Sequence, residues 1–239
     1  YRFDERGIGK SEGDFSELAK DLSNDLSYAF NQLKKKHIHK KIGILGHSLG
    51  GIATLELIAN NIKPNFIILI ETPILKNGAF ILNQLKMDYE KRLPEVMRKG
   101  KSKNETLTFL QEYFQVIANS KSNSLKKEVK KHIKDKGFNK RFIVLLKDDF
   151  LVEMANINLE ETLKKSSMKS LYLTGTKDKI ISHKDEINLV KSFKNPNIEI
   201  KIFEGLNHWL TTKNAQVGTS LYKTDTTVLK KIINWTLKE

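Results

Sequence analysis

A serine enclosed by glycines is the part of the sequence best suited to chemistry. Ser48 lies in the run Gly46-His47-Ser48-Leu49-Gly50-Gly51, which matches the pattern G-x-S-x-G. In this pattern the serine occupies a sharp turn between a strand and a helix, where small residues two places before and after it avoid collisions. The N–H group of the following residue, Leu49, is expected to stabilise an oxyanion. We therefore predict Ser48 as a nucleophile and Leu49 as an oxyanion donor.

A serine hydroxyl is a weak nucleophile unless a base accepts its proton, and histidine is the usual base. His208 lies in the loop Gly205-Leu206-Asn207-His208-Trp209, directly after a predicted strand, and is our candidate base. His183, at the expected start of a helix, ranks second. His47 is expected to point away on its turn. The remaining histidines are assigned to solvated faces: His37, His39 and His132.

An acid is needed to orient the imidazole of the base. Asp178 ends the segment Gly175-Thr176-Lys177-Asp178, and choosing it gives the chain order Ser, Asp, His. Glu71, which closes the run Phe66–Ile70, is the competing acid. The poorer candidates are Asp148 and Asp149. The lysines on either side of Asp178 are expected to help keep it ionised: Lys177 and Lys179.

The elements that must position these residues alternate between strands and helices. A helix is expected after Asp14, a candidate N-cap with Glu17 at capping-box spacing, and it ends in the lysines 34–36. Further helices are expected over 51–60 and from Asp225 onward. Tyr1–Phe3 is expected to be the end of a strand. The other expected strands are Ile42–Leu45, Phe66–Ile70, Leu171–Leu173 and, near an edge of the sheet, Ile198–Phe203. This alternation predicts an α/β fold with a mostly parallel sheet.

The middle of the chain differs from its two ends in composition. Residues 73–167 are rich in lysine and helical in pattern, with a single strand-like run, Phe142–Leu146. We predict that 1–72 and 168–239 form the two parts of one core. The segment 73–167 is then a helical cap insertion, expected to cover the site and select the acyl or alcohol group.

Composition excludes several classes of protein. The 239 residues are 39% hydrophobic and 29% charged, which is typical of a globular chain, and no apolar run is long enough to span a membrane. The absence of cysteine excludes disulfides and thiolate metal sites. The net charge of +14 comes mostly from lysine, whereas nucleic-acid binding favours arginine, so we expect no nucleic-acid partner.

Four segments together resemble the α/β-hydrolase superfamily, and in particular bacterial esterase-like hydrolases grouped with serine aminopeptidases (S33) and monoacylglycerol lipases. They are the runs 3–11, 46–51, 175–178 and 205–208. The resemblance implies a serine hydrolase that cleaves carboxylic esters through an acyl-enzyme, with Ser48, Asp178 and His208 as its triad. It implies a small-molecule ester or acyl substrate and needs no metal or organic cofactor. Peptidase, thioesterase or acyltransferase chemistry on the same triad is one alternative, and an inert binding module is the other.

The resemblance also predicts further structure before Tyr1. Members of the superfamily begin with about three more strands and a helix, and the loop after the third strand supplies a second oxyanion N–H. We therefore expect an N-terminally incomplete hydrolase, which alone is poorly active and prone to self-associate through the unpaired edge of Ile42–Leu45. Relatives include secreted and cytoplasmic enzymes, so neither a location nor an oligomeric state is assigned.

Overall fold

The computed structural model describes residues 1–87, 89–212 and 223–239, and divides the chain into two compact units. The first unit joins Tyr1–Ile74 to Leu159–Glu239, and the second is Leu75–Asn158. The second unit lies within the segment 73–167 that the sequence marks as an insertion. Among the described residues, no helix is both long and apolar enough to cross a membrane.

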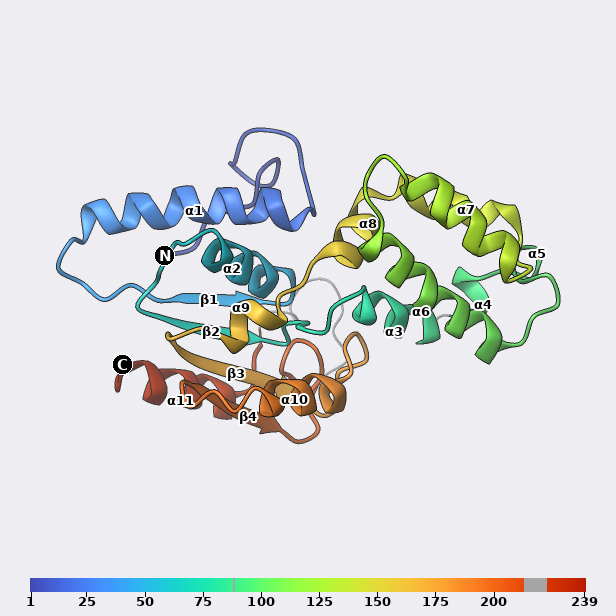
Figure 1. Cartoon of the computed structure of the whole chain (residues 1–239). Helices are drawn as coiled ribbons and strands as arrows, with labels where there is room; N and C mark the ends of the chain where they lie inside the picture. The colour runs from blue at the N-terminus through green and yellow to red at the C-terminus, as the bar shows by residue number, and fades with distance from the viewer. Residues whose placement is uncertain (88, 213–222) are drawn as a thin grey trace. The chain divides into compact units, whose positions relative to one another are not determined.

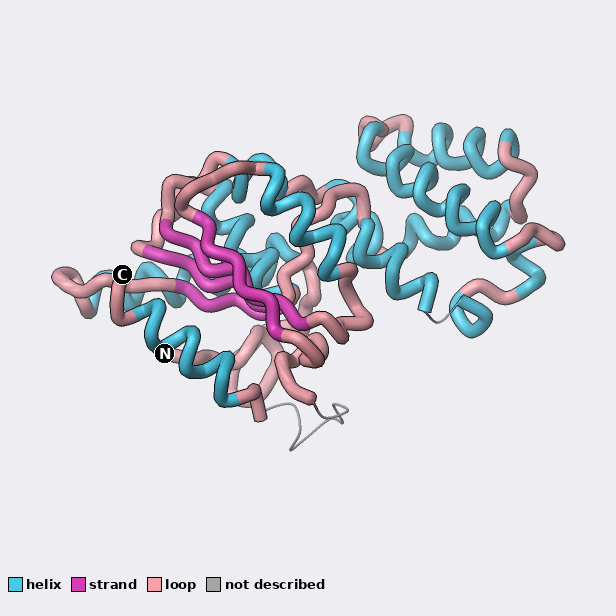
Figure 2. The backbone as a smooth tube through the Cα atoms, turned by 90° about the horizontal axis from the view of Figure 1, so that it is seen from below, coloured by secondary structure: helices cyan, strands magenta, loops and turns pink. Residues whose placement is uncertain are grey.

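The first unit is built on a four-stranded sheet in which every neighbouring pair of strands is parallel. Its spatial order follows the chain order, so β1 and β4 form the two edges (Figures 1 and 2). The parallel α/β fold expected from the sequence is therefore confirmed. The strands are β1 (Ile44–His47), β2 (Phe66–Ile70), β3 (Lys169–Gly175) and β4 (Ile198–Phe203).

Both faces of the sheet are covered by helices, which explains why the central strands are continuously apolar. The helices α1 (Ala19–Lys36) and α2 (Leu49–Ala59) pack on the face that carries Ile44. The opposite face, which carries Leu171, packs against α11 (Thr226–Thr236). The two shorter helices of this unit are α9 (Glu160–Lys164) and α10 (His183–Ser192). Since the strands are parallel, their carboxyl ends and the loops that follow them gather at one edge.

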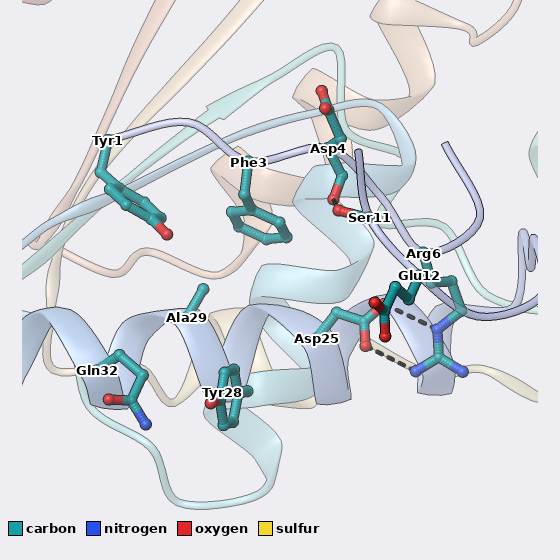
Figure 3. Close-up of a pocket in the computed structure, with 10 residues that line it drawn as sticks. All are labelled: Tyr1, Phe3, Asp4, Arg6, Ser11, Glu12, Asp25, Tyr28, Ala29 and Gln32. Carbon is teal, nitrogen blue, oxygen red and sulfur yellow. Dashed lines mark hydrogen bonds and ion pairs between the residues drawn. The ribbon is translucent and has the colours of Figure 1, made fainter. Parts of the chain in front are cut away.

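The N-terminal segment differs from the sequence prediction. Tyr1–Phe3 is not a strand, and α1 begins at Ala19 rather than after Asp14, with no side-chain cap. The reason is a local turn at Ser16, whose hydroxyl accepts from the Leu18 N–H and donates to Asp21 Oδ2 and so competes with helix before Ala19. Arg6 pairs with Asp25 of α1 at 2.7 Å, which holds the N-terminal segment beside the helix. A hollow of about 330 Å³ results between this segment and α1 (Figure 3). It is lined by Tyr1, Phe3, Asp4, Arg6, Ser11, Glu12, Asp25, Tyr28, Ala29 and Gln32.

The second unit consists of helices around an aromatic core. Phe109 stacks on Phe138 with ring centroids 4.0 Å apart and meets Phe142 edge-on. The predicted strand Phe142–Leu146 lies instead in a 3₁₀-helix. The prediction is wrong because a short apolar run does not by itself distinguish a strand from a buried helical segment. The elements are α3 (Ala79–Met87), α4 (Tyr89–Arg92), α5 (Glu95–Arg98), α6 (Lys103–Asn119), α7 (Leu125–Asp135), η1 (Lys140–Lys147) and α8 (Asp149–Asn156).

Candidate active site

Ser48 occupies the turn between β1 and α2 in an unusual backbone conformation. Its φ of 53° and ψ of −117° lie in a region that residues other than glycine rarely adopt. The Ser48 N–H donates to the carbonyl oxygen of Ile70 at the end of β2, at 2.9 Å. The turn is thus fixed to the neighbouring strand, and the half-buried serine lies at the carboxyl edge of the sheet.

Two glycines make this turn possible, and only the first of them, Gly46, is at a position where the motif predicts crowding. A Cβ on Gly46 would collide with the backbone of Gly50, and a Cβ on Gly51 would collide with Thr72. At Gly50 itself a Cβ would meet no atom within 4 Å. The expectation of crowding two places after the serine is therefore wrong, because α2 brings the next glycine, Gly51, against the segment after β2.

The N-terminus of α2 lies directly after Ser48. Leu49 is the first residue of this helix, and its N–H group has no acceptor in a preceding helical turn. The N–H groups of Gly51 and Ile52 donate to the carbonyl oxygen of Ser48. The Leu49 N–H is therefore suited by its position to receive a developing negative charge beside Ser48, and its oxyanion role stays a prediction.

Asp178 and His208 meet in a buried contact. Asp178 follows β3 and His208 follows β4, and His208 Nδ1 lies 2.7 Å from Asp178 Oδ2. The side chains are 0% and 5% exposed, respectively. Gly175 lets the two loops approach, because a Cβ there would collide with the carbonyl group of Leu206. The two residues that the sequence singled out from distant loops are thus adjacent.

The charge of Asp178 depends on its hydrogen bonds. Burial alone would raise the pKa of Asp178, but the hydrogen bond and charge of His208, together with Glu71 and the Ile180 N–H, lower it below its ordinary value. Its Oδ1 atom accepts from the Ile180 N–H at 2.6 Å. In the described part of the chain, neither Lys177 nor Lys179 forms an ion pair with this carboxylate. The role suggested for the flanking lysines therefore has no direct ion pair behind it and stays a prediction.

His47 lies against His208, contrary to the expectation that it points away. The two ring centroids are 4.9 Å apart, and His47 Nε2–H donates to the carbonyl oxygen of His208 at 2.7 Å. Burial lowers the pKa of His47, which favours the neutral ring. Because His47 immediately precedes Ser48, this bond ties the turn of the serine to the loop of His208. Among the described residues, no hydrogen bond joins Ser48 Oγ to the His208 imidazole.

Glu71, the competing acid, belongs to the same cluster. It is fully buried and directly follows β2, and its carboxylate accepts from Thr174 Oγ1 at 2.8 Å and from the Gly175 N–H at 2.5 Å. Burial and the neighbouring Asp178 raise the pKa of Glu71 to about 10. Its contact with His208 is less direct than that of Asp178, which holds the imidazole nitrogen itself.

The other candidates have structural surroundings. His183 opens α10 as expected, and Asp148 caps α8 by accepting from the Leu151 N–H. His132 is half-buried and stacks on Phe109 with centroids 5.0 Å apart, so it is not a solvated residue. His37, His39 and Asp149 are exposed, and Asp149 is the first residue of α8.

The cluster of Glu71, Asp178 and His208 also has the residue types of a metal-ion site. One ligand atom from each of Glu71, Asp178 and His208 lies within 4.8 Å of the other two. However, His208 Nδ1 is bonded to Asp178, and the two oxygens of Glu71 accept from Thr174 Oγ1 and the Gly175 N–H. We therefore assign these three residues to a hydrogen-bonded network rather than to a metal.

A parallel sheet with Ser48 on a strained strand-to-helix turn, and with Asp178 and His208 on the loops after the last two strands, defines an α/β-hydrolase fold. The family model described as serine aminopeptidase, S33, matches residues 1–214, and the chain belongs to this family of hydrolases. A search of curated proteins finds no significant match.

Solved structures share this fold at low sequence identity. An esterase from Exiguobacterium antarcticum has a TM-score of 0.54 at 15% identity, with 99% of this chain and 80% of that chain covered. A bromoperoxidase from Bacillus anthracis has a TM-score of 0.54 at 14% identity, with the same coverage of 99% and 80%. The esterase PF2001 of Pyrococcus furiosus has a TM-score of 0.50 at 17% identity, and the chain covers 59% of it and is itself covered over 84%.

Proposed function

We propose that the protein is a serine hydrolase that cleaves carboxylic esters through an acyl-enzyme. Ser48 is the nucleophile, His208 the general base and acid, and Asp178 the group that orients the imidazole. The Leu49 N–H stabilises the oxyanion. The observation that carries the proposal is the buried 2.7 Å contact between His208 Nδ1 and Asp178 Oδ2, on loops that end at the same edge of the sheet as Ser48.

The contacts around Ser48 support its place in the same site. Its N–H group is bound to the end of β2, and the preceding residue, His47, is bound to the carbonyl oxygen of His208. The first bond fixes the turn of the serine to the central sheet, and the second ties it to the loop that carries His208. Catalytic hydrogen bonds are often long or incomplete before substrate binds, so the proposed bond between Ser48 Oγ and His208 Nε2 is one that forms with substrate.

In the proposed reaction the contact with Asp178 fixes His208 Nδ1 as the protonated nitrogen, which leaves Nε2 to accept a proton. Ser48 Oγ attacks the ester carbonyl while His208 Nε2 takes the hydroxyl proton. The carbonyl oxygen becomes an oxyanion beside the Leu49 N–H. His208 then returns the proton to the leaving alcohol, and the C–O bond of the ester breaks. Water, deprotonated by the same imidazole, releases the acid and restores Ser48.

Peptide hydrolysis on the same residues is the second candidate, favoured by the description of the matching family as serine aminopeptidase. An ester makes the smaller demand on the site, because an alcohol leaves from the tetrahedral intermediate more easily than an amine does. The role expected for the helical unit, selection of the acyl or alcohol group, stays a prediction, as do thioesterase and acyltransferase chemistry.

A substrate panel tests this proposal. The full chain is assayed with p-nitrophenyl esters of increasing acyl length, with aminoacyl p-nitroanilides and with acyl thioesters, and Ser48→Ala serves as the control for each. We expect the p-nitrophenyl esters to give the highest kcat/KM and Ser48→Ala to abolish it. A preference for anilides would favour the peptidase, and ester hydrolysis that survives in Ser48→Ala would refute the proposed nucleophile.

A further inference from the structure

A second buried carboxyl group lies beside the proposed triad and has no part in the mechanism above. Glu71 is 0% exposed and has a φ of 44°, in the left-handed region. Residues other than glycine remain in that region only where their surroundings fix them, and such residues cluster at functional sites. The position of this side chain is therefore determined by the fold rather than by local preference.

The end of β3 provides those surroundings. The Glu71 N–H donates to the carbonyl oxygen of Leu173 at 2.9 Å, which extends the pairing of β2 with β3 by one bond. The carboxyl group then accepts from Thr174 Oγ1 and from the Gly175 N–H. All three partners lie shortly before Asp178 on the same strand and turn. Glu71 is thus anchored to the segment that carries Asp178.

Glu71 also lies next to the contact between Asp178 and His208. One ligand atom from each of the three residues lies within 4.8 Å of the other two. Asp178 Oδ2 faces His208 Nδ1, and Asp178 Oδ1 accepts from the N–H groups of Ile180 and Ile181. The backbone donors hold one oxygen of Asp178, and the carboxyl group of Glu71 is a further group beside this carboxylate.

Two ionised carboxylates are not stable at this separation in a buried site without a nearby cation. The burial of Glu71 and the charge of Asp178 raise the pKa of Glu71 to about 10, whereas the pKa of Asp178 is lowered overall. At neutral pH Glu71 is therefore the carboxylic acid of the pair and Asp178 the carboxylate. The proton of Glu71 makes it a donor, and a donor to an ionised acceptor forms a strong hydrogen bond.

We propose that Glu71 is a positioning residue, whose carboxyl group donates to the Asp178 carboxylate and keeps that carboxylate directed at His208. The proposal rests on the proposed function, since it matters only if Asp178 orients a catalytic imidazole. Without the donor, Asp178 keeps its backbone bonds but loses one of the contacts that fix its carboxylate. In a fraction of the protein molecules the His208 imidazole is then wrongly oriented, which lowers kcat rather than substrate affinity.

Two substitutions at Glu71 test whether a neutral hydrogen-bond donor at this position is sufficient. Glu71→Leu removes the hydrogen-bonding group, and Glu71→Gln replaces it by a neutral amide whose N–H₂ donates and whose oxygen accepts. With p-nitrophenyl butyrate as the probe, we expect Glu71→Leu to lower kcat about 10- to 100-fold, the cost of one hydrogen bond to a charged group, with KM within about threefold. Glu71→Gln should recover most of this loss. The exposed Glu17 supplies the matched control, Glu17→Gln.

The reference variants Ser48→Ala and Asp178→Asn distinguish the possible failures. If Ser48→Ala keeps the wild-type rate, the proposed function and the role of Glu71 are both overturned. If Ser48→Ala and Asp178→Asn are inactive while Glu71→Leu keeps the wild-type kcat, only the role of Glu71 is overturned. An equal loss in Glu71→Gln and Glu71→Leu also overturns it, because the neutral donor would then be insufficient.

A further variant decides the matter if Glu71→Leu does not fold. Thr174→Val removes the hydroxyl that anchors Glu71 and keeps the size of the side chain. We expect kcat to fall about two- to tenfold, the effect of one neutral hydrogen bond, with KM unchanged. A wild-type kcat in Thr174→Val, together with an inactive Glu71→Gln, would overturn the assignment of Glu71 as a neutral donor.

Discussion

The pH dependence of folding stability should reveal the proton that Glu71 retains. The pKa of this buried side chain is raised from 4.5 to about 10, first by burial and then by Asp178. Between these two values the folded chain holds a proton that the unfolded chain has released. Stability is therefore highest below the unfolded pKa and falls as pH rises toward the folded pKa. Glu71→Gln cannot ionise, so it removes this loss.

The size of the effect follows from one proton. Each pH unit within the window costs the wild-type protein up to about 1.4 kcal/mol relative to the variant. Between pH 6 and pH 8 the difference in unfolding free energy should grow by about 2.7 kcal/mol. For a chain of this length that is a change of about 5–11 °C in the difference between the two Tm values.

Thermal unfolding of both proteins at pH 6, 7 and 8, followed by circular dichroism, measures this difference. Glu17→Gln removes an exposed carboxylate and is the control, with a Tm difference from the wild type that does not change over the same range. A gap between Glu71→Gln and the wild type that stays constant or shrinks as pH rises would refute the reasoning, because Glu71 would then be ionised in the folded chain.

Three other experiments test separate parts of the structure. Gly51→Ala should destabilise the protein by about 1–3 kcal/mol in urea unfolding, because its Cβ overpacks against Thr72. Gly50→Ala places a Cβ in open space and should change stability by less than about 0.5 kcal/mol. Equal effects would contradict the proposed crowding at Gly51. His47→Phe keeps a ring beside His208 but removes the bond to its carbonyl oxygen, and should lower kcat about two- to tenfold; an unchanged rate would show that this bond does not position the loop. Ser102→Ala removes the capping box of α6 and should cost about 1 kcal/mol of stability, measured by urea unfolding; no change in the midpoint would contradict it.

The parallel sheet could be predicted because its strands leave a local pattern. Phe66–Ile70 is a continuous apolar run and Ile198–Phe203 alternates, and both have the bounds that the sequence predicted. Other elements depend on side-chain contacts. The capping pattern at Asp14 predicts a helix that starts earlier than Ala19, but the hydroxyl of Ser16 bonds to the Leu18 N–H and to Asp21 and delays it. The pairing of the N-terminal segment with α1 through Arg6 and Asp25 depends on residues 19 positions apart. The sequence predicts a strand at Phe142, but the segment is a 3₁₀-helix. The ring of Phe142 packs against Phe109 of α6, a contact that the local sequence does not indicate.

In the candidate site, too, some features follow from the sequence and others depend on distant contacts. Residues after parallel strands meet at one edge, so the approach of Asp178 to His208 follows from their positions in the sequence. The contact of His47 with His208 joins residues 161 positions apart, and nothing in its local sequence indicates it. Glu71 was recognised as a possible acid, but its anchoring to Thr174 and its place beside Asp178 depend on the register of β2 with β3.

Covalent labelling of Ser48 tests the central proposal most directly. A fluorophosphonate probe reacts with an activated serine when Oγ attacks phosphorus and fluoride leaves. Intact-mass and peptide mass spectrometry should show one adduct on the wild-type protein, located on Ser48, and a much slower reaction in Asp178→Asn and His208→Ala. Labelling that persists in Ser48→Ala, or an adduct on another residue, would contradict the account.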